Sequence, residues 1–388
     1  MLPIRRETVL AALLLLFLIG CQPTAVSPPA PAPATSIGSS ADAWPLFRGD
    51  SRATGVAQGT LPANLQLLWT FSTDKGGFES TAAIVEGTVY VGSTDGNLYA
   101  IDLATGKRRW AMPTELGFTA SPAVRDGLVC IGDSDGRFYG VDAKTGKAKW
   151  TFDAEAEIDS SANFYKDCVL FGSQDSYLYC LNAGTGKLAW KYESKDQIRC
   201  FPTTVGDRAL VAACDGQLHV VDLRLGKSVA DIAIDSPTGC AAAALGDMVF
   251  VGTEGNQFLA INLRQKKVLW RFENTANAFP FRSSAAVTPQ AVVVGSRDKR
   301  LYAFEPKTGR PVWTFVSKGR IDSSPVVVGD RLFVGSADGR LYALDLKSGR
   351  ELWRFAAGGA LTASPAVAAG RLVIGTDDGN LYCFGAKP

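Results

Sequence analysis

Histidine is nearly absent from this 388-residue chain, which contains one, His219. A Ser-His-Asp triad or a histidine-rich metal site needs partners at suitable spacings, and the sequence around His219 supplies none. We therefore predict that His219 is a packing substitution and not a catalytic base.

The chain also has almost no net charge and few regular cysteine spacings. Lys and Arg total 40 against 38 for Asp and Glu, a formal net charge of +2, which argues against a nucleic-acid partner. The cysteines after Cys21 are odd in number and show no C-x-x-C spacing, so neither a disulfide framework nor a zinc site is indicated. We expect most of them to be small buried residues in strands.

The apolar run near the N-terminus, residues 9–19, follows two arginines and is too short to span a bilayer comfortably. This pattern predicts a secretory signal peptide over residues 1–20. The sequence Leu-Ile-Gly-Cys that ends at Cys21 resembles a lipobox, which implies cleavage before Cys21 and a lipid on its sulfur. Gln22 after the cysteine implies, by resemblance to Gram-negative sorting, the outer membrane. A plain signal peptide or an uncleaved anchor is the alternative.

The rest of the chain divides by composition. Residues 21–43 are rich in Pro and Ala without apolar periodicity, which predicts an extended tether between a lipid surface and a folded body. Residues 44–64 form a lead-in segment. Residues 65–388 carry evenly spread apolar residues and are long enough for a large core.

An internal repeat dominates residues 65–388. The segment VGSTDGNLYAIDLATGKRRW, residues 91–110, recurs at intervals of about 40 residues, and such a period indicates a solenoid or a propeller. Within each copy, β-branched and aromatic residues alternate in short runs between Gly, Asp and Asn turns, with no helical period. Eight copies begin at Val91, Ile131, Phe171, Val211, Val251, Val294, Val334 and Ile374.

Each copy predicts four short antiparallel strands. In the first copy we place them at residues 78–85, 89–93, 97–103 and 107–112. The pair Asp95-Gly96 supplies the turn between the second and third strands, because glycine tolerates left-handed backbone. Where another copy has Lys299 at the glycine position, we expect up to about 1 kcal/mol of strain.

A tryptophan column shows how the repeats close. The eighth copy ends before its fourth strand, whereas Trp69, in LQLLWTF, precedes the first complete copy. An N-terminal strand that completes the last blade explains both, and predicts an all-β, eight-bladed propeller of four-stranded antiparallel blades. An open solenoid would need polar caps at both ends. We expect the indoles to cover the junctions between blades: Trp69, Trp110, Trp150, Trp190, Trp270, Trp313 and Trp353. Ala230 and the blade 5 turn NLRQKK depart from the pattern.

The repeat consensus V-G-S-x-D-G-x-L-Y-A-x-D-x-x-T-G-x-x-x-W, found over residues 65–384, resembles the PQQ-like repeat of quinoprotein-type β-propellers. The lead-in WPLFRGDSRATGV, residues 44–56, also resembles the segment that opens many such proteins. A lipid-anchored, single-domain form is similar to the BamB family of lipoproteins from the outer-membrane β-barrel assembly machinery. That resemblance implies a monomeric, non-catalytic scaffold that faces the periplasm and binds envelope proteins, including that machinery.

The resemblance to quinoprotein dehydrogenases implies a second possible function, that of a PQQ-dependent oxidoreductase or of an electron-transfer accessory protein. Those enzymes are generally longer and add adjacent cysteines, a calcium site and a catalytic Asp. Adjacent cysteines are absent from this sequence. We therefore expect no cofactor, with PQQ and calcium as the alternative. A third possibility is a binder of small molecules or carbohydrate at the channel mouth.

Asymmetry among the copies marks candidate binding residues. One column at the start of the innermost strands reads Glu79, Thr119, Asp159, Arg199, Gly239, Arg282, Asp322 and Thr362. These strand ends approach the central channel, so the charges are expected at one mouth, with Asp159 and Asp322 across the channel. Arg199 and Arg282 would flank Gly239 and hold a small anion or a partner's carboxylate. A solvated rim of mutually paired charges is the alternative.

Two cysteines occupy equivalent positions in neighbouring inner strands, Cys200 and Cys240. A disulfide between them would join blades 4 and 5 and compensate for the missing indole at Ala230. Two free thiols are the alternative.

Overall fold

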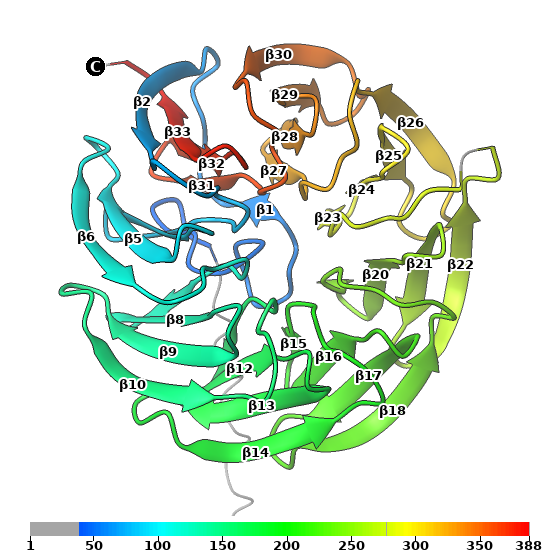
Figure 1. Ribbon diagram of the computed structural model, residues 1–388. Helices are drawn as coiled ribbons and strands as arrows, with labels where there is room; N and C mark the ends of the chain where they lie inside the picture. Colours follow the sequence, from blue (N-terminus) through cyan, green and yellow to red (C-terminus); the bar gives the residue numbers. More distant parts are fainter. Residues whose placement is uncertain (1–38, 277, 388) are drawn as a thin grey trace, which may run out of the picture. The chain divides into compact units, whose positions relative to one another are not determined.

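The computed structural model describes residues 39–276 and 278–387. The predicted signal peptide, Cys21 and most of the tether lie outside the described residues. In the described part all regular structure is β, and no helix there could cross a membrane. The strands form eight antiparallel sheets arranged as the blades of a ring (Figure 1). The predicted eight-bladed propeller is confirmed.

The strands of the first four blades have the following bounds. Blade 1 contains β3 (Ala83–Val85), β4 (Thr88–Gly92), β5 (Asn97–Asp102) and β6 (Arg108–Pro113). Blade 2 contains β7 (Ala123–Arg125), β8 (Leu128–Gly132), β9 (Arg137–Asp142) and β10 (Ala148–Asp153). Blade 3 contains β11 (Asn163–Tyr165), β12 (Cys168–Gly172), β13 (Tyr177–Asn182) and β14 (Leu188–Glu193). Blade 4 contains β15 (Thr203–Val205), β16 (Arg208–Ala212), β17 (Gln217–Asp222) and β18 (Lys227–Ala233).

The remaining blades include the two N-terminal strands. Blade 5 contains β19 (Ala243–Leu245), β20 (Met248–Gly252), β21 (Gln257–Asn262) and β22 (Lys267–Glu273). Blade 6 contains β23 (Ala286–Val287), β24 (Val292–Gly295), β25 (Arg300–Phe304) and β26 (Pro311–Val316). Blade 7 contains β27 (Val326–Val328), β28 (Arg331–Ser336), β29 (Arg340–Asp345), β30 (Glu351–Ala356) and the added β1 (Val56–Ala57). Blade 8 contains β31 (Ala366–Ala368), β32 (Arg371–Gly375), β33 (Asn380–Gly385) and β2 (Gln66–Ser72).

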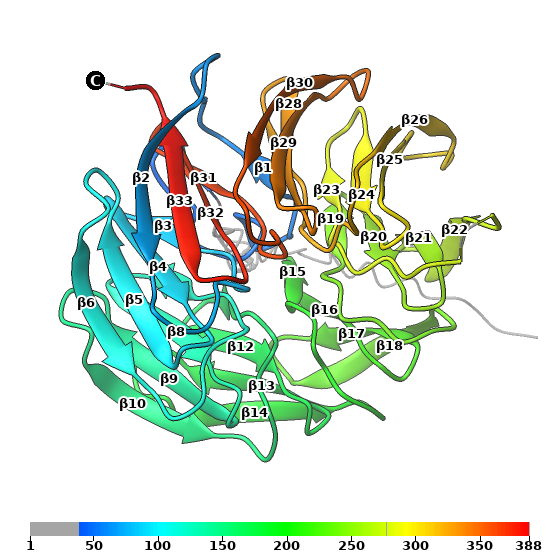
Figure 2. The ribbon, with the colours of Figure 1, turned by 45° about the horizontal axis from the view of Figure 1, so that its top comes forward.

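The ring closes through the N-terminal strand, as the tryptophan column predicts. Strand β2 pairs antiparallel with β33, with Trp69 opposite Cys383, and becomes the outer strand of blade 8 (Figure 2). The inner strand β31 of blade 8 contacts β3 of blade 1. Because blade 8 is made from both ends of the repeat region, opening the ring requires breaking a full strand pairing.

The innermost strands are shorter than predicted. The first was expected at residues 78–85, but β3 covers only Ala83–Val85. Near the axis neighbouring blades converge, so the backbone there bonds to hydroxyl groups of the adjacent blade. The Ser121 N–H donates to Ser161 Oγ and the Ser324 N–H to Ser364 Oγ, each at 2.9 Å. These side-chain bonds take the place of a sheet ladder.

Two turns within each repeat explain most of the recurring residues. In the turn between the second and third strands, Tyr99 Oη donates to Asp95 at 2.7 Å, and Gly96 has a φ of +93°. The same tyrosine-to-aspartate bond recurs in blades 3, 6 and 7, whereas in blade 2 Tyr139 donates to Asp133, two residues before the turn aspartate Asp135. Lys299 at the glycine position has a φ of +71°, the left-handed backbone that the sequence predicts.

The tryptophan column joins each blade to the next through a glycine turn. Six indole N–H groups donate to a backbone carbonyl in the following blade's turn between the third and fourth strands, at 2.9 to 3.2 Å. The glycine of that turn packs closely against the face of the indole ring. At Gly146, for example, an added Cβ would lie 2.7 Å from the Trp110 ring. Indole and glycine are therefore one unit of packing.

The junction between blades 4 and 5 lacks both members of this unit. Ala230 replaces the tryptophan of blade 4, and Lys266 occupies the glycine position of the blade 5 turn with a φ of +54°. Without an indole beneath it, the turn has room for a side chain, and Lys266 Nζ reaches the Val229 carbonyl at 3.4 Å. The two departures seen in the sequence thus have a single cause.

Replacing Gly146 by Ala tests the indole–glycine contact. We expect the free energy of unfolding to fall by roughly 2–4 kcal/mol, because overpacking against Trp110 adds to the cost of a left-handed backbone. Gly127 is the matched control, since its φ is +72° and an added Cβ would meet nothing within 4 Å. Chemical denaturation of Gly127→Ala should show a loss of only about 1 kcal/mol. Equal losses in the two variants would contradict the contact.

The lead-in lies inside the ring and contacts every blade. We name residues 41–57 the central segment (Figure 1). Its residues Trp44 and Ile84 of blade 1 exchange backbone bonds at 2.7 and 2.8 Å, and Asn163 of blade 3 donates to its Ser51 carbonyl at 3.0 Å. Six further inner-strand or turn amides donate to its carbonyls at 2.7 to 2.9 Å: Val124, Thr204, Ala244, Val287, Val327 and Ala369. The folded part thus already includes Ala41, before the predicted boundary at residue 44.

Arg48 anchors the central segment. Its side chain is fully buried and donates to the backbone carbonyls of Ser324, Ala285 and Pro325 in blades 6 and 7. Burial lowers the pKa of the guanidinium, which indicates how strongly the site disfavours an unpaired charge. The carbonyls belong to residues just before the inner strands β23 and β27, outside the sheet ladder, so Arg48 satisfies backbone groups that converge on the axis.

Replacing Arg48 by Ala should lower the free energy of unfolding by about 2–4 kcal/mol, since buried carbonyls lose their charged donor. Arg52, an exposed neighbour in the same segment, is the control. Its replacement by Ala should change stability by no more than about 0.5 kcal/mol, measured by thermal and chemical denaturation. If the two variants behave alike, the anchoring role is wrong.

Candidate functional site

The column predicted at the channel mouth comes together in the structure. All eight of its positions, Glu79 through Thr362, line one cavity of about 180 Å³. A second ring of hydroxyl side chains lies below them, and Phe47 of the central segment forms part of the wall, with its ring 5.9 Å from that of Phe201. The central segment therefore closes the channel from within and leaves a shallow, polar mouth.

The mouth charges are paired by a rule that sequence reasoning missed. For Arg282, Asp322 and Arg199, a partner comes from the turn between the second and third strands of the preceding blade. Arg282 forms two bonds with Glu254, at 2.7 and 3.0 Å, and this carboxylate raises the pKa of Arg282. Asp322 accepts two bonds from Arg297, at 2.8 and 2.9 Å. For Arg282 and Asp322 the partners could have been found by comparing that turn position across copies, because Glu254 and Arg297 carry the opposite charge.

Arg199 is held more loosely. It donates to Gln174 at 3.2 Å and lies 3.7 Å from the Asp159 carboxylate, and its side chain is 45% exposed. Asp159 also accepts a bond from Thr119 at 2.8 Å. Arg199 thus has the weaker ion pairing of the two arginines.

A side cavity opens between the two arginines. In the junction between blades 4 and 5, the mouth-column residue of blade 5 is Gly239 and the matching turn residue of blade 4 is Cys214. Neither carries a charge. The resulting cavity of about 350 Å³ is lined by Arg199, Arg282, Glu254 and these two residues, together with Pro237 and Thr238. The structure therefore brings together Arg199, Gly239 and Arg282 as the sequence predicts, and adds Glu254 as a competing carboxylate.

His219 is a buried structural residue with more partners than its sequence context suggests. It replaces the tyrosine of the turn bond, and its Nε2 lies 2.9 Å from Asp215. Its Nδ1 lies 2.8 Å from Asp231 and 3.0 Å from Tyr192 Oη. Only 4% of the residue is exposed, so no substrate reaches the ring. Spacing along the chain does not reveal Asp231 as a partner, because strand pairing brings it beside His219.

The predicted disulfide between Cys200 and Cys240 is not formed, and both residues are free thiols. The Cys240 thiol lies 3.0 Å from the Phe281 carbonyl of blade 6 and is therefore directed towards the next blade. Burial raises the pKa of both thiols to about 12. A different pair is close together, Cys168 and Cys180 on neighbouring strands of blade 3, where the hydrogen bond from Cys180 lowers the pKa of Cys168.

Cys168 should therefore be the reactive thiol of the described residues. We expect its alkylation by iodoacetamide to rise through a midpoint below that of an ordinary thiol, because the thiolate is the nucleophile. Buried Cys200 and Cys240 should stay unmodified in the native protein, as peptide mass spectrometry would show. In a Cys180→Ala variant the midpoint should rise towards that of an ordinary thiol. An unchanged midpoint in that variant would refute the role of Cys180.

Comparison with known proteins identifies the family. The model of the family described as outer membrane protein assembly factor BamB matches residues 55–200, 174–314 and 297–387. The chain belongs to this family. The BamB structure from Moraxella catarrhalis is similar, with a TM-score of 0.70 and 20% identity over 84% of this chain and 98% of that chain. The predicted resemblance to BamB-like repeat propellers is confirmed. A comparison with curated protein sequences gave no match.

Quinoprotein enzymes share the fold. Quinohemoprotein alcohol dehydrogenase from Comamonas testosteroni gives a TM-score of 0.73 at 16% identity, over 89% of this chain and 81% of that chain. A europium-containing methanol dehydrogenase gives 0.71 at 14% identity, over 90% and 99%. At these identities the likeness establishes the fold alone.

The residues at the mouth do not match the donor set that the quinoprotein resemblance implies. That set includes adjacent cysteines, which the sequence lacks, and a calcium site. Within residues 39–276 and 278–387, no three His, Cys, Asp or Glu side chains are grouped to hold a metal ion. The carboxylates of Asp322 and Asp159 are instead bonded to arginine, glutamine and threonine side chains. The mouth does not fit PQQ with calcium.

Proposed function

We propose that this protein is a non-catalytic binding scaffold of the bacterial envelope that takes part in the assembly of outer-membrane proteins. The family match over most of the chain supports the general role. The observation that carries the non-catalytic part is the closed channel, because the central segment occupies the axis and leaves only a shallow mouth cavity of about 180 Å³ there. Lipid attachment at Cys21 would hold the propeller at the outer membrane.

The binding surface in this proposal is the channel mouth. Its loops come from different blades and carry different charges, so it is the face that repetition leaves asymmetric. Arg199 is 45% exposed and only loosely paired, and Arg282 lies on the other side of the side cavity. A carboxylate of a partner protein placed there would compete with Glu254 and bond to both arginines.

Affinity capture from solubilised envelopes tests the function. The lipidated wild-type protein should co-purify with subunits of the β-barrel assembly machinery. The Arg199→Ala/Arg282→Ala variant should recover them at least about five-fold less, since two charge-assisted bonds are lost. The matched control replaces Arg108 and Arg264, both exposed and away from the mouth, and should recover normal amounts.

Two outcomes would contradict the proposal. Absence of the assembly machinery from the wild-type capture would overturn the role in outer-membrane assembly. Dye reduction after reconstitution with PQQ and calcium would overturn the non-catalytic part. Equal recovery by the two arginine variants would leave the scaffold but remove the mouth as its binding surface.

A further inference from the structure

Besides the junction between blades 4 and 5, a second blade junction lacks the indole–glycine contact, although its tryptophan is present. Trp353, at the end of blade 7, faces blade 8, whose third and fourth strands β33 and β2 come from distant parts of the chain. No turn connects those two strands, so no glycine covers the indole. Trp353 Nε1 has no hydrogen-bond partner among the described residues, whereas six equivalent indoles each have one.

The carbonyl in the matching position is used elsewhere. Acceptors such as Ala143 and Leu346 follow their tryptophans by 33 residues. The residue that far after Trp353 is Ala386, and its carbonyl accepts a bond from Arg371 Nη1 at 3.3 Å within blade 8. The chain therefore does not fill the place in front of Trp353 with its own turn.

A cavity occupies this place. It has a volume of about 580 Å³, within the range of ligand sites, and is lined by Trp353, Leu352, Asp345 and Arg350 of blade 7. Leu61, Ala63 and Leu65 of the lead-in form another wall, and their segment is held by Arg331, which donates to the Leu61 and Pro62 carbonyls at 2.6 and 2.9 Å. We name this cavity the closure slot.

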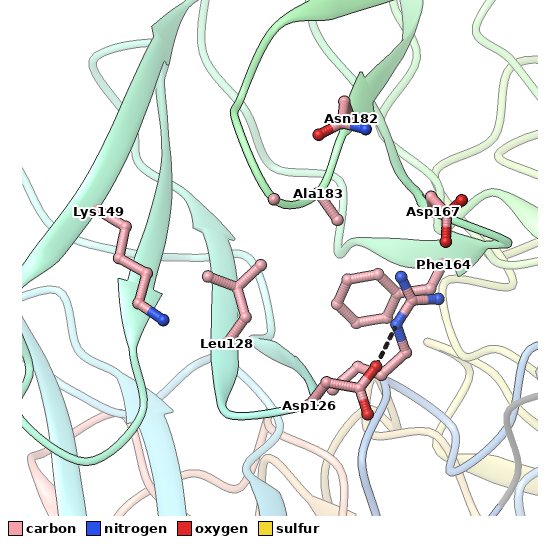
Figure 3. A pocket seen from close by; sticks show the side chains of 9 residues that line it. Asp126, Leu128, Lys149, Phe164, Asp167, Asn182 and Ala183 are labelled. Atoms are coloured by element: carbon pink, nitrogen blue, oxygen red, sulfur yellow. Dashed lines mark ion pairs between the residues drawn. The ribbon is translucent and has the colours of Figure 1, made fainter.

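An intact junction shows what is missing. The corresponding cavity between blades 2 and 3 measures about 350 Å³, and its wall includes Ala183 and Gly184 from the blade 3 turn (Figure 3). There, Ala183 accepts the bond of Trp150 at 2.9 Å, and Gly186 of the same turn lies on its indole. The closure slot is larger, and its wall contains the lead-in residues Leu61 and Ala63 where the intact junction has a turn of the next blade.

The open indole sets the chemistry of an occupant. It offers an N–H donor that needs a carbonyl, and a flat face on which only a Cα without a side chain fits closely. Leu352 beside it is 43% exposed, and Asp330, Asp345, Arg331 and Arg350 at the rim provide polar partners. In every intact junction these requirements are met by a tight turn that contains glycine.

We propose that the closure slot binds a glycine-containing tight turn of a partner polypeptide, with a turn carbonyl on Trp353 Nε1 and the glycine Cα on the indole face. The partner completes the junction as the blade's own turn does elsewhere in the ring. The inference rests on the proposed function only in taking the partner to be a protein. It places a second binding surface at the outer edge of the ring, separate from the mouth.

The test uses the full chain and a cyclic hairpin peptide that copies Asp102–Lys107, the turn that covers Trp69. Indole N–H signals in ¹⁵N-tryptophan-labelled protein report each site, and Trp353→Phe assigns the Trp353 signal. We expect this N–H to exchange fastest with water and to shift and slow on adding the peptide. Trp353→Phe should weaken peptide binding roughly five-fold, the effect of one lost hydrogen bond.

Two controls distinguish binding in the closure slot from binding elsewhere on the ring. Trp313→Phe, at an intact junction, should leave peptide affinity unchanged, and a peptide with valine in place of glycine should bind at least about ten-fold more weakly. Thermal melts of both tryptophan variants exclude unfolding as the cause. Absence of peptide binding at millimolar concentration, or equal binding by Trp353→Phe, would overturn the proposal.

Two further outcomes also bear on it. A variant that lacks residues 386–388 and binds the peptide at least about ten-fold more tightly would overturn the proposal by showing that the chain's own tail is the occupant. If the peptide does not bind, the envelope capture can still support the proposed scaffold function. If the capture fails, peptide binding to the closure slot can still be measured. The two proposals are thus tested independently.

Discussion

The contact between an indole and a glycine turn is the constraint on which the ring depends. Each four-stranded blade is too small to bury its faces alone, so stability comes from the junctions. Because a glycine must lie on the indole, tryptophan and glycine are replaced together, as Ala230 and Lys266 show. The same constraint makes Trp353 unusual, since ring closure by β2 leaves it without a turn.

The central segment solves a second problem of a propeller, the inner edges of its blades. Inner strands present backbone groups towards the axis, and unpaired buried groups are costly. The segment bonds to all eight blades, and Arg48 supplies a charged donor where several carbonyls converge. With the channel filled in this way, any ligand or partner meets the molecule at its rim or mouth. This favours a function in binding over one in which a cofactor is enclosed.

Function in such a fold lies where the repeats differ. The mouth arginines, their partners in the preceding blade and the uncharged Cys214 and Gly239 create one asymmetric surface from nearly identical units. The closure slot differs from the other junctions for another reason. The outer two strands of blade 8, β33 and β2, come from opposite ends of the repeat region, so no turn joins them. Scaffolds and quinoprotein enzymes share this fold, so their difference must come from side chains at these places rather than from the propeller.

The sequence by itself determined the all-β class, the eight blades, the strand and turn order, the closing N-terminal strand and the convergence of Glu79 to Thr362 on one mouth. These follow from period, alternation and turn chemistry, which are properties of one repeat and of its count. Only the tertiary structure decided the place of the central segment, the partners of Arg282 and His219, the free thiols of Cys200 and Cys240, and the open indole of Trp353. These features depend on which side chains from distant segments meet when the ring closes. Local sequence patterns do not determine those contacts.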